Sequence, residues 1–207
     1  MKVLHINASA RDDKSQSLRL ADVFIDEFRK KRNDIIIDRF DLFHDELPEF
    51  GAIASGAKMA LFTGTEQTAE QKSVWDNARA VFDRFAEADV YVFNIPLWNN
   101  GMPYILKQFI DVVTQPGWAF GFDMEKGYTG LLTNKKAFVV HASGVYRDGI
   151  APNFGSDFSS PYFRDWLNFV GVEDIHEVKF MPTVVNNDIE NTYLTAEKET
   201  KALISHF

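Results

Sequence analysis

The sequence contains no cysteine. This absence excludes disulfides, thiolate nucleophiles, iron–sulfur clusters and cysteine-based zinc sites, and it suits a reducing, cytoplasmic setting. Basic residues are also scarce, with 22 Lys and Arg against 30 Asp and Glu and a formal net charge of −8. Such a field repels phosphate backbones and anionic membranes, so we expect neither nucleic acid nor a membrane as a partner.

Long apolar runs are missing as well. No segment approaches the length of a membrane span, and the apolar stretch within Met1–Asn7 is too short for a signal peptide. The five histidines lack the spacing of metal ligands, so no metal site is expected.

Three familiar motifs do not occur in the chain. The lack of G-x-G-x-x-G removes the usual dinucleotide fingerprint, and the lack of G-x-x-x-x-G-K-[ST] removes a triphosphate loop. Without G-x-S-x-G there is no nucleophile elbow, so Ser9, Ser15 and Ser143 are not expected to act as hydrolase nucleophiles.

What is present is an alternation of short β-branched and aromatic runs with longer segments of helical periodicity. This pattern is typical of βαβ units around a parallel sheet. Five strands are predicted, at Lys2–Asn7, Ile35–Phe40, Val90–Ile95, Lys136–His141 and Ile175–Met181. The third and fourth contain continuous apolar runs, which indicates central strands covered on both faces.

Apolar residues at three- and four-residue spacing predict the helices between these strands. The stripes include Phe24, Phe82, Phe109 and Trp166, and a last helix is predicted over Thr195–His206. Two boundaries have specific signals. Thr68 and Gln71 have the spacing of a capping box at the start of the second helix, and Gly171 follows the fourth.

The stretch from Leu42 to Gln67 has weak periodicity and is interpreted as a long connection with at most one helical turn. We therefore predict a single α/β domain over residues 1–207, a three-layer sandwich with a five-stranded parallel sheet of order 2-1-3-4-5. In this topology a ligand binds beyond the carboxyl ends of strands 1 and 3.

The loop Ala8–Ser17 joins the first strand to the first helix. A phosphate there would meet free backbone N–H groups and the positive end of the helix dipole, with the hydroxyls of Ser9, Ser15 and Ser17 as further donors. The alternative is that Ser17 merely caps the helix and the other serines are ordinary loop residues.

The third strand ends in Ile95-Pro-Leu-Trp-Asn-Asn-Gly-Met102. A large ring beside two amides at the end of a central strand favours contact with a flat heteroaromatic ligand. In the alternative interpretation Trp98 packs in the core and the asparagines only form a turn.

The fourth strand ends in His141-Ala-Ser-Gly-Val-Tyr-Arg-Asp-Gly149, where Gly144 permits close approach of the backbone to a ligand. An ordinary glycine turn explains this segment equally well.

Aromatic residues are dense in Pro116-Gly-Trp-Ala-Phe-Gly-Phe122. We expect Phe120 and Phe122 to stack on a planar substrate, and we assign Phe163 to the substrate side with them. Alternatively, these rings pack against the sheet or a second subunit.

Three segments together carry a resemblance that extends over nearly the whole chain. They are Ser9 with Ser15-Gln16-Ser17, then Pro96-Leu-Trp-Asn-Asn-Gly-Met-Pro-Tyr-Ile-Leu-Lys-Gln-Phe-Ile-Asp111, and Lys135-Lys136-Ala137 leading to Ser143-Gly144. In these segments the chain resembles the FMN-dependent NADH:quinone oxidoreductases and azoreductases of the flavodoxin-like superfamily.

The resemblance implies FMN as cofactor and assigns residues to it. Ser9, Ser15, Gln16 and Ser17 would hold the phosphate and ribityl chain; Pro96, Leu97, Trp98, Asn99 and Asn100 would line the ring; Ala142, Ser143, Gly144 and Tyr146 would meet its pyrimidine end. It also implies a homodimer whose interface completes each pocket.

The expected activity is transfer of hydride from NADH or NADPH through the flavin to a quinone or azo compound, in a ping-pong cycle with no catalytic side chain. Two alternatives stay open. One is a flavodoxin-like single-electron carrier without a substrate pocket, and the other is a flavodoxin-like protein that binds no flavin.

Overall fold

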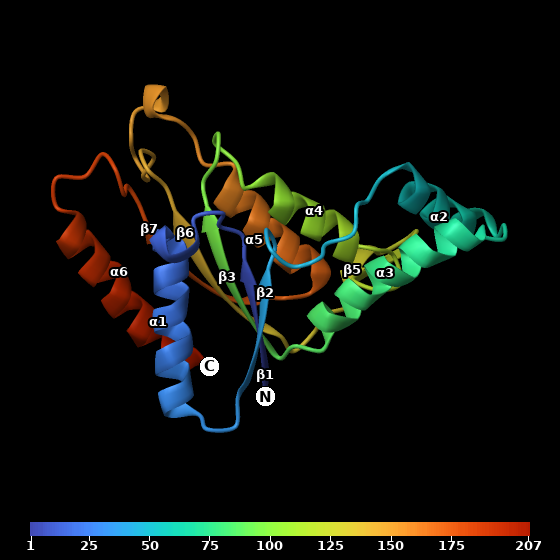
Figure 1. The fold of residues 1–207 in the computed structure, drawn as a ribbon, viewed down its shortest axis with the longest axis horizontal. Helices are drawn as coiled ribbons and strands as arrows, with labels where there is room; N and C mark the ends of the chain where they lie inside the picture. The colour runs from blue at the N-terminus through green and yellow to red at the C-terminus, as the bar shows by residue number, and fades with distance from the viewer.

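In the computed structural model, which describes residues 1–207, the central element is a five-stranded parallel sheet (Figure 1). The strands are β1 (Lys2–Asn7), β2 (Ile36–Asp41), β3 (Val90–Pro96), β6 (Lys136–Ala142) and β7 (Asp174–Phe180). They lie side by side in the order β2-β1-β3-β6-β7. Numbered by their succession along the chain, this is the order 2-1-3-4-5, so the predicted sheet is confirmed.

The apolar content of each strand matches its place in the sheet. In β3, between β1 and β6, Val90 to Ile95 are all buried, as are Ala137 to Ala142 of β6. The edge strand β2 has a single buried residue, Phe40. Continuous apolar runs therefore identified the central strands correctly.

Helices cover both faces of the sheet (Figure 1). The helices α1 (Gln16–Lys31) and α6 (Ile189–Leu203) bury one face, where Phe24 stacks on Phe138 of β6 with ring centroids 4.1 Å apart. The helices α3 (Ala69–Ala86), α4 (Tyr104–Val113) and α5 (Ser159–Val170) cover the other face, around a core that contains Phe109 and Trp166. Each fully buried aromatic side chain contributes about 1.5–3 kcal/mol.

The predicted helix signals act as expected. Thr68 accepts the N–H of Gln71 while Gln71 accepts the N–H of Thr68, so the capping box of α3 is confirmed. The helix α5 ends at Gly171, whose φ of +102° suits glycine. Three short 3₁₀ segments complete the helical elements: η1 (Asp12–Lys14), η2 (Pro152–Phe154) and η3 (Ile204–His206).

The prediction for the segment Leu42–Gln67 was wrong, because it contains the twelve-residue helix α2 (Ala52–Thr63). Its buried residues are Ala54, Ala57 and Ala60, and it packs on α3 rather than on the sheet. Alanine adds little hydrophobic contrast, so the stripe at three-residue spacing gave no clear signal.

Two further differences are local. The chain from Phe120 to Gly130 forms a hairpin of β4 (Phe120–Asp123) and β5 (Gly127–Gly130), and strands of four residues are too short to show a periodicity. The last helix begins earlier than predicted, at Ile189, because Asp188 caps it by accepting the N–H of Asn191. No helix in the structure combines the length and the apolar character needed to cross a membrane.

Candidate cofactor-binding site

A cavity of about 140 Å³ lies where the loops after β1, β3 and β6 meet. It is lined by residues of these three loops and of the segment after β7: Ser9, Arg11, Ser15, Gln16, Ser17, Pro96, Leu97, Trp98, Ala142, Ser143, Gly144, Thr183 and Val184. Carboxyl ends of parallel strands meet at one edge of a sheet, which is why segments far apart in the chain converge here. Ten of the thirteen residues predicted to contact the cofactor line this single cavity.

The start of α1 provides an anion site at one end of the cavity. Ser15 is the N-cap, and its Oγ accepts the N–H of Leu18 at 3.2 Å. The N–H groups of Gln16 and Ser17, the first two of the helix, donate to no acceptor in the protein. Both groups lie at the positive end of the helix dipole, and the hydroxyl of Ser17 is 3.3 Å from that of Ser15.

The charge balance of the cavity favours the same ligand. Arg11 is the one charged residue among those that line it, and the others are hydroxyl, amide, apolar or glycine residues. A terminal phosphate therefore meets one guanidinium, several hydroxyls and unpaired N–H groups, with no carboxylate to oppose it.

Three further lining residues provide an apolar part of the cavity wall. Pro96, Leu97 and Trp98 continue from β3, and the N–H of Leu97 donates to the carbonyl of Ala142 at 2.7 Å, which joins the second and third loops. Proline, leucine and tryptophan side chains provide a surface suited to a planar ring.

Trp98 and Gly101 close a two-residue turn, with two hydrogen bonds of 2.8 Å between their backbones. Asn99 and Asn100 form the turn with φ of 50° and 67°, a conformation that asparagine tolerates well. The Oδ1 of Asn100 accepts the N–H of Ser156 at 3.1 Å. Trp98 lines the cavity, and neither asparagine does.

Tyr146 is also outside the cavity. It lines a neighbouring polar hollow of about 540 Å³ that includes Asp148 and Lys179, and its hydroxyl donates to Asp148 at 3.4 Å. Tyr146, Asn99 and Asn100 therefore do not line the smaller cavity, and their contact with the ring stays a prediction.

Three lining residues, Arg11, Thr183 and Val184, were not predicted. The N–H groups of Thr183 and Val184 donate to the carbonyls of Ser143 and Gly144, both at 2.8 Å, so the segment after β7 is attached to the third loop. The available signal was topological, because any segment that follows a parallel strand reaches this edge of the sheet. Arg11 was visible in the first loop but has no motif of its own.

Phe163, which the sequence assigns to the substrate side, does not line the smaller cavity. Its side chain is fully buried between the ring of Phe93, at 4.8 Å, and that of Trp166, at 5.3 Å. Phe163 is therefore a core residue of the α5 layer.

Phe120 and Phe122 also lie away from the cavity of their own chain. Both rings contact Tyr128 across the hairpin, and Phe120 contacts Phe169 at the C-terminal end of α5. The start of α5 is close to Asn100, since the N–H of Phe158 donates to the Asn100 carbonyl. The length of α5, at 1.5 Å per residue, thus separates these rings from the site by roughly 15 Å.

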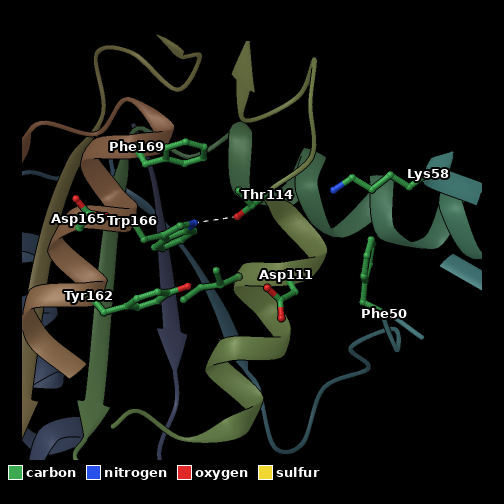
Figure 2. Close-up of a pocket in the computed structure, with 9 residues that line it drawn as sticks. Phe50, Lys58, Asp111, Thr114, Tyr162, Asp165, Trp166 and Phe169 are labelled. Carbon is green, nitrogen blue, oxygen red and sulfur yellow. Dashed lines mark hydrogen bonds between the residues drawn. The ribbon is translucent and has the colours of Figure 1, made fainter. Parts of the chain in front are cut away.

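A larger cavity, of about 360 Å³, lies on the outer surface between α4, α5 and α2 (Figure 2). Tyr162, Trp166 and Phe169 form one wall, with Phe50 and Lys58 opposite, and the Trp166 indole donates to Thr114 Oγ1 at 2.9 Å. Burial lowers the pKa of Lys58. The cavity has no helix N-terminus and contains two carboxylates, Asp111 and Asp165, so it does not suit a phosphate.

Comparison with known proteins finds relatives along nearly the whole chain. A family model described as the flavodoxin-like fold (Flavodoxin_2) matches residues 1–203. The FMN-dependent NADH:quinone oxidoreductase of Ruegeria pomeroyi is 40% identical over 192 residues, which cover 93% of this chain and 94% of that protein. A similarly named protein of Pseudomonas fluorescens is 36% identical, with 96% and 93% covered.

A solved structure has a closely similar fold. The FMN-dependent NADH-azoreductase of Bacillus anthracis, determined in complex with FMN, has a TM-score of 0.89 and 26% identity, and the match covers 99% of this chain and 98% of that one. With the fold, the anion site and relatives matched along almost their full length, the chain belongs to the FMN-dependent NADH:quinone oxidoreductase family of flavodoxin-like proteins.

Proposed function

We propose that the chain binds FMN in the smaller cavity and is an enzyme that uses NADH to reduce quinones and azo compounds. The observation that carries this proposal is the pair of unpaired N–H groups at Gln16 and Ser17, beside three serine hydroxyls and Arg11. This donor set fits a phosphate monoester, and relatives up to 40% identical are named for FMN dependence.

In this assignment Ser9, Ser15, Gln16 and Ser17 hold the phosphate and ribityl chain. Pro96, Leu97 and Trp98 would line the ring, and Ala142, Ser143 and Gly144 would meet its pyrimidine end. FMN, when bound, supplies the two-electron hydride chemistry. None of the residues lining the cavity is an acid–base group, so the chain's own contribution is to bind and orient.

The small volume of the cavity has a structural consequence. A volume of about 140 Å³ is small for a whole FMN molecule, so in this proposal the phosphate end would be enclosed and the ring would extend over an open surface. A nicotinamide and an acceptor would therefore use the same exposed side of the ring in turn.

We also propose that a second copy of the chain covers this open side. Support comes from exposed aromatic residues outside the core: Tyr104, Phe122, Tyr128, Phe158 and Tyr162 are each 41–67% exposed. An apolar surface of this kind is typical of an interface. In a homodimer, Phe120 and Phe122 of one copy regain the predicted role of contacting substrate at the other copy.

Residues 1–207 would act as one flavodoxin-like domain, and the absence of cysteine favours the cytoplasm. A steady-state assay of the FMN-loaded protein tests the function, with NADH and NADPH as donors and quinones and azo dyes as acceptors. We expect catalytic consumption of NADH and parallel double-reciprocal lines. Binding of FMN without turnover would favour the single-electron carrier, and intersecting lines would reject the ping-pong order.

A further inference from the structure

Three polar side chains are buried directly beneath the anion site. His5 and Asn7 on β1 and Asn94 on β3 are 2%, 5% and 0% exposed. They share the α1 side of the sheet with Val3 and Val92, since side chains alternate along a strand. A polar group in such a position destabilises the fold unless it is hydrogen-bonded, so each of the three needs a defined partner.

The donor and the acceptor of each hydrogen bond can be assigned, starting from Arg39. The guanidinium of Arg39 lies 3.0 Å from His5 Nδ1, and because arginine can only donate, Nδ1 accepts. Burial lowers the pKa of His5 to about 4, so the ring is neutral at pH 7 and its proton is on Nε2. That Nε2 therefore donates to Asn94 Oδ1 at 2.8 Å.

The orientation of Asn94 follows from this tautomer. With Oδ1 facing His5, its Nδ2 donates to Asn7 Oδ1 at 2.6 Å and lies 3.5 Å from the hydroxyl of Ser17. The same Asn7 Oδ1 accepts the N–H of Ser9 at 3.0 Å. The chain of hydrogen bonds thus ends at Ser9 and Ser17, which both line the cavity.

A second anchor holds Asn7. Its Nδ2 donates to Asp41 Oδ2 at 2.6 Å. Burial by itself raises the pKa of Asp41, but hydrogen bonds from Asn7, the Phe43 N–H and His44 outweigh this and lower that pKa overall. Asp41 is therefore a carboxylate at neutral pH, and it fixes which end of the Asn7 amide faces Ser9.

We propose that His5, Asn7 and Asn94 are positioning residues that hold Ser9 and Ser17 in the geometry required by the phosphate of the cofactor. The proposal rests on the FMN-binding function proposed above and specifies how this chain builds the phosphate end of the site. His5 contacts neither the loop nor the cavity, so any effect of His5 on the cofactor must pass through Asn94.

The test compares FMN with riboflavin, which has the same ring but no phosphate. Apoprotein is titrated with each flavin and followed by flavin fluorescence. For Asn94→Leu and His5→Leu we expect the Kd for FMN to rise about tenfold, because Ser17 would lose the geometry of one hydrogen bond to the phosphate, while the Kd for riboflavin stays within about twofold of wild type. His5→Gln keeps a donor at the Nε2 position and should restore most of the FMN affinity.

The matched control is Val92→Ala, on the same strand and the same buried face. It should lower the melting temperature of the apoprotein yet leave the affinities for both flavins unchanged. The ³¹P resonance of bound FMN adds an independent readout: it should shift in Asn94→Leu and stay in place in Val92→Ala.

If a buried variant does not fold, Arg39→Met tests the exposed start of the chain of hydrogen bonds, and a weakening selective for FMN is expected there too. Equal losses for FMN and riboflavin, or no loss in any of these variants, would overturn the proposal. Failure of the wild type to bind FMN would instead overturn the proposed function, so the two failures are distinguishable.

Discussion

Asn100 Oδ1 accepts the N–H of Ser156 at 3.1 Å, and the Asn100 carbonyl accepts the N–H of Phe158 at 2.9 Å. The turn that follows β3 is thereby attached to the segment that leads into α5. A residue that the sequence places beside the cofactor is thus a structural link between two layers.

This link predicts different effects for two adjacent asparagines. Both have positive φ, which glycine adopts freely, but Asn100 alone has a side-chain hydrogen bond to another segment. Asn100→Gly should lower the free energy of unfolding by about 1 kcal/mol, and Asn99→Gly should change it by less than about 0.5 kcal/mol. Urea unfolding measures both, and equal losses would contradict the structural role of Asn100.

Ser15 and Ser17 should also respond differently. Ser15 caps α1, so Ser15→Ala should cost about 1 kcal/mol of stability as well as FMN affinity. Ser17 does not cap the helix, and Ser17→Ala should weaken FMN binding about tenfold with little change in stability. Flavin titration and urea unfolding of the two apoproteins separate these effects. A large stability loss in Ser17→Ala alone would reverse the assignment.

The fold was predictable where the chain is strongly patterned. Apolar runs in β3 and β6 reflect burial on both faces and identify these as central strands, and the alternation of strands and helices predicts the sheet order. The helix α2 was not predictable, because alanines at positions 54, 57 and 60 form a stripe with little hydrophobic contrast, on a helix that packs on α3.

The site was predictable to the extent that topology determines it. Ser9, Trp98 and Gly144 follow strands whose carboxyl ends must meet, whereas the direction of the Asn100 and Tyr146 side chains depends on partners far away in the chain. Likewise, a phenylalanine at position 163 suits either the core or a substrate site, and only the packing of α5 on Phe93 shows that Phe163 is in the core.

Gly130 predicts a strong steric effect at the hairpin. A Cβ added there would lie 2.2 Å from the backbone nitrogen of Gly171 and 2.5 Å from the carbonyl carbon of Val170. Gly130→Ala should therefore lower the free energy of unfolding by about 2–3 kcal/mol. Gly51→Ala is the control, because nothing lies within 4 Å of its added Cβ, and it should cost less than about 1 kcal/mol. Similar losses of stability in the two variants would show that the hairpin moves to make room for the added Cβ, which would contradict the prediction.

His5 predicts a specific dependence of stability on pH. Its pKa in the folded protein is lowered from 6.5 to about 4, chiefly by burial, so below pH 6.5 the unfolded chain takes up a proton that the folded chain does not. Stability from this residue is complete above pH 6.5, falls as the pH drops to 4, and changes no further below that. The total loss is about 3 kcal/mol.

His5→Gln isolates this contribution, because the variant keeps the carboxylates, including Asp22 and Asp41 beside His5, and removes only the titrating ring. Urea unfolding from pH 7 to pH 4 should show that the wild type loses stability relative to the variant as the pH falls. A difference independent of pH would show that His5 is not the titrating group.

The most direct test of the whole account is titration of the apoprotein with FMN, followed by flavin fluorescence and the visible spectrum, on the wild type and Ser17→Ala in parallel. The account predicts saturable binding of one FMN per chain, with affinity reduced about tenfold by loss of the Ser17 hydroxyl. A wild-type protein that leaves FMN fluorescence and spectrum unchanged would contradict it.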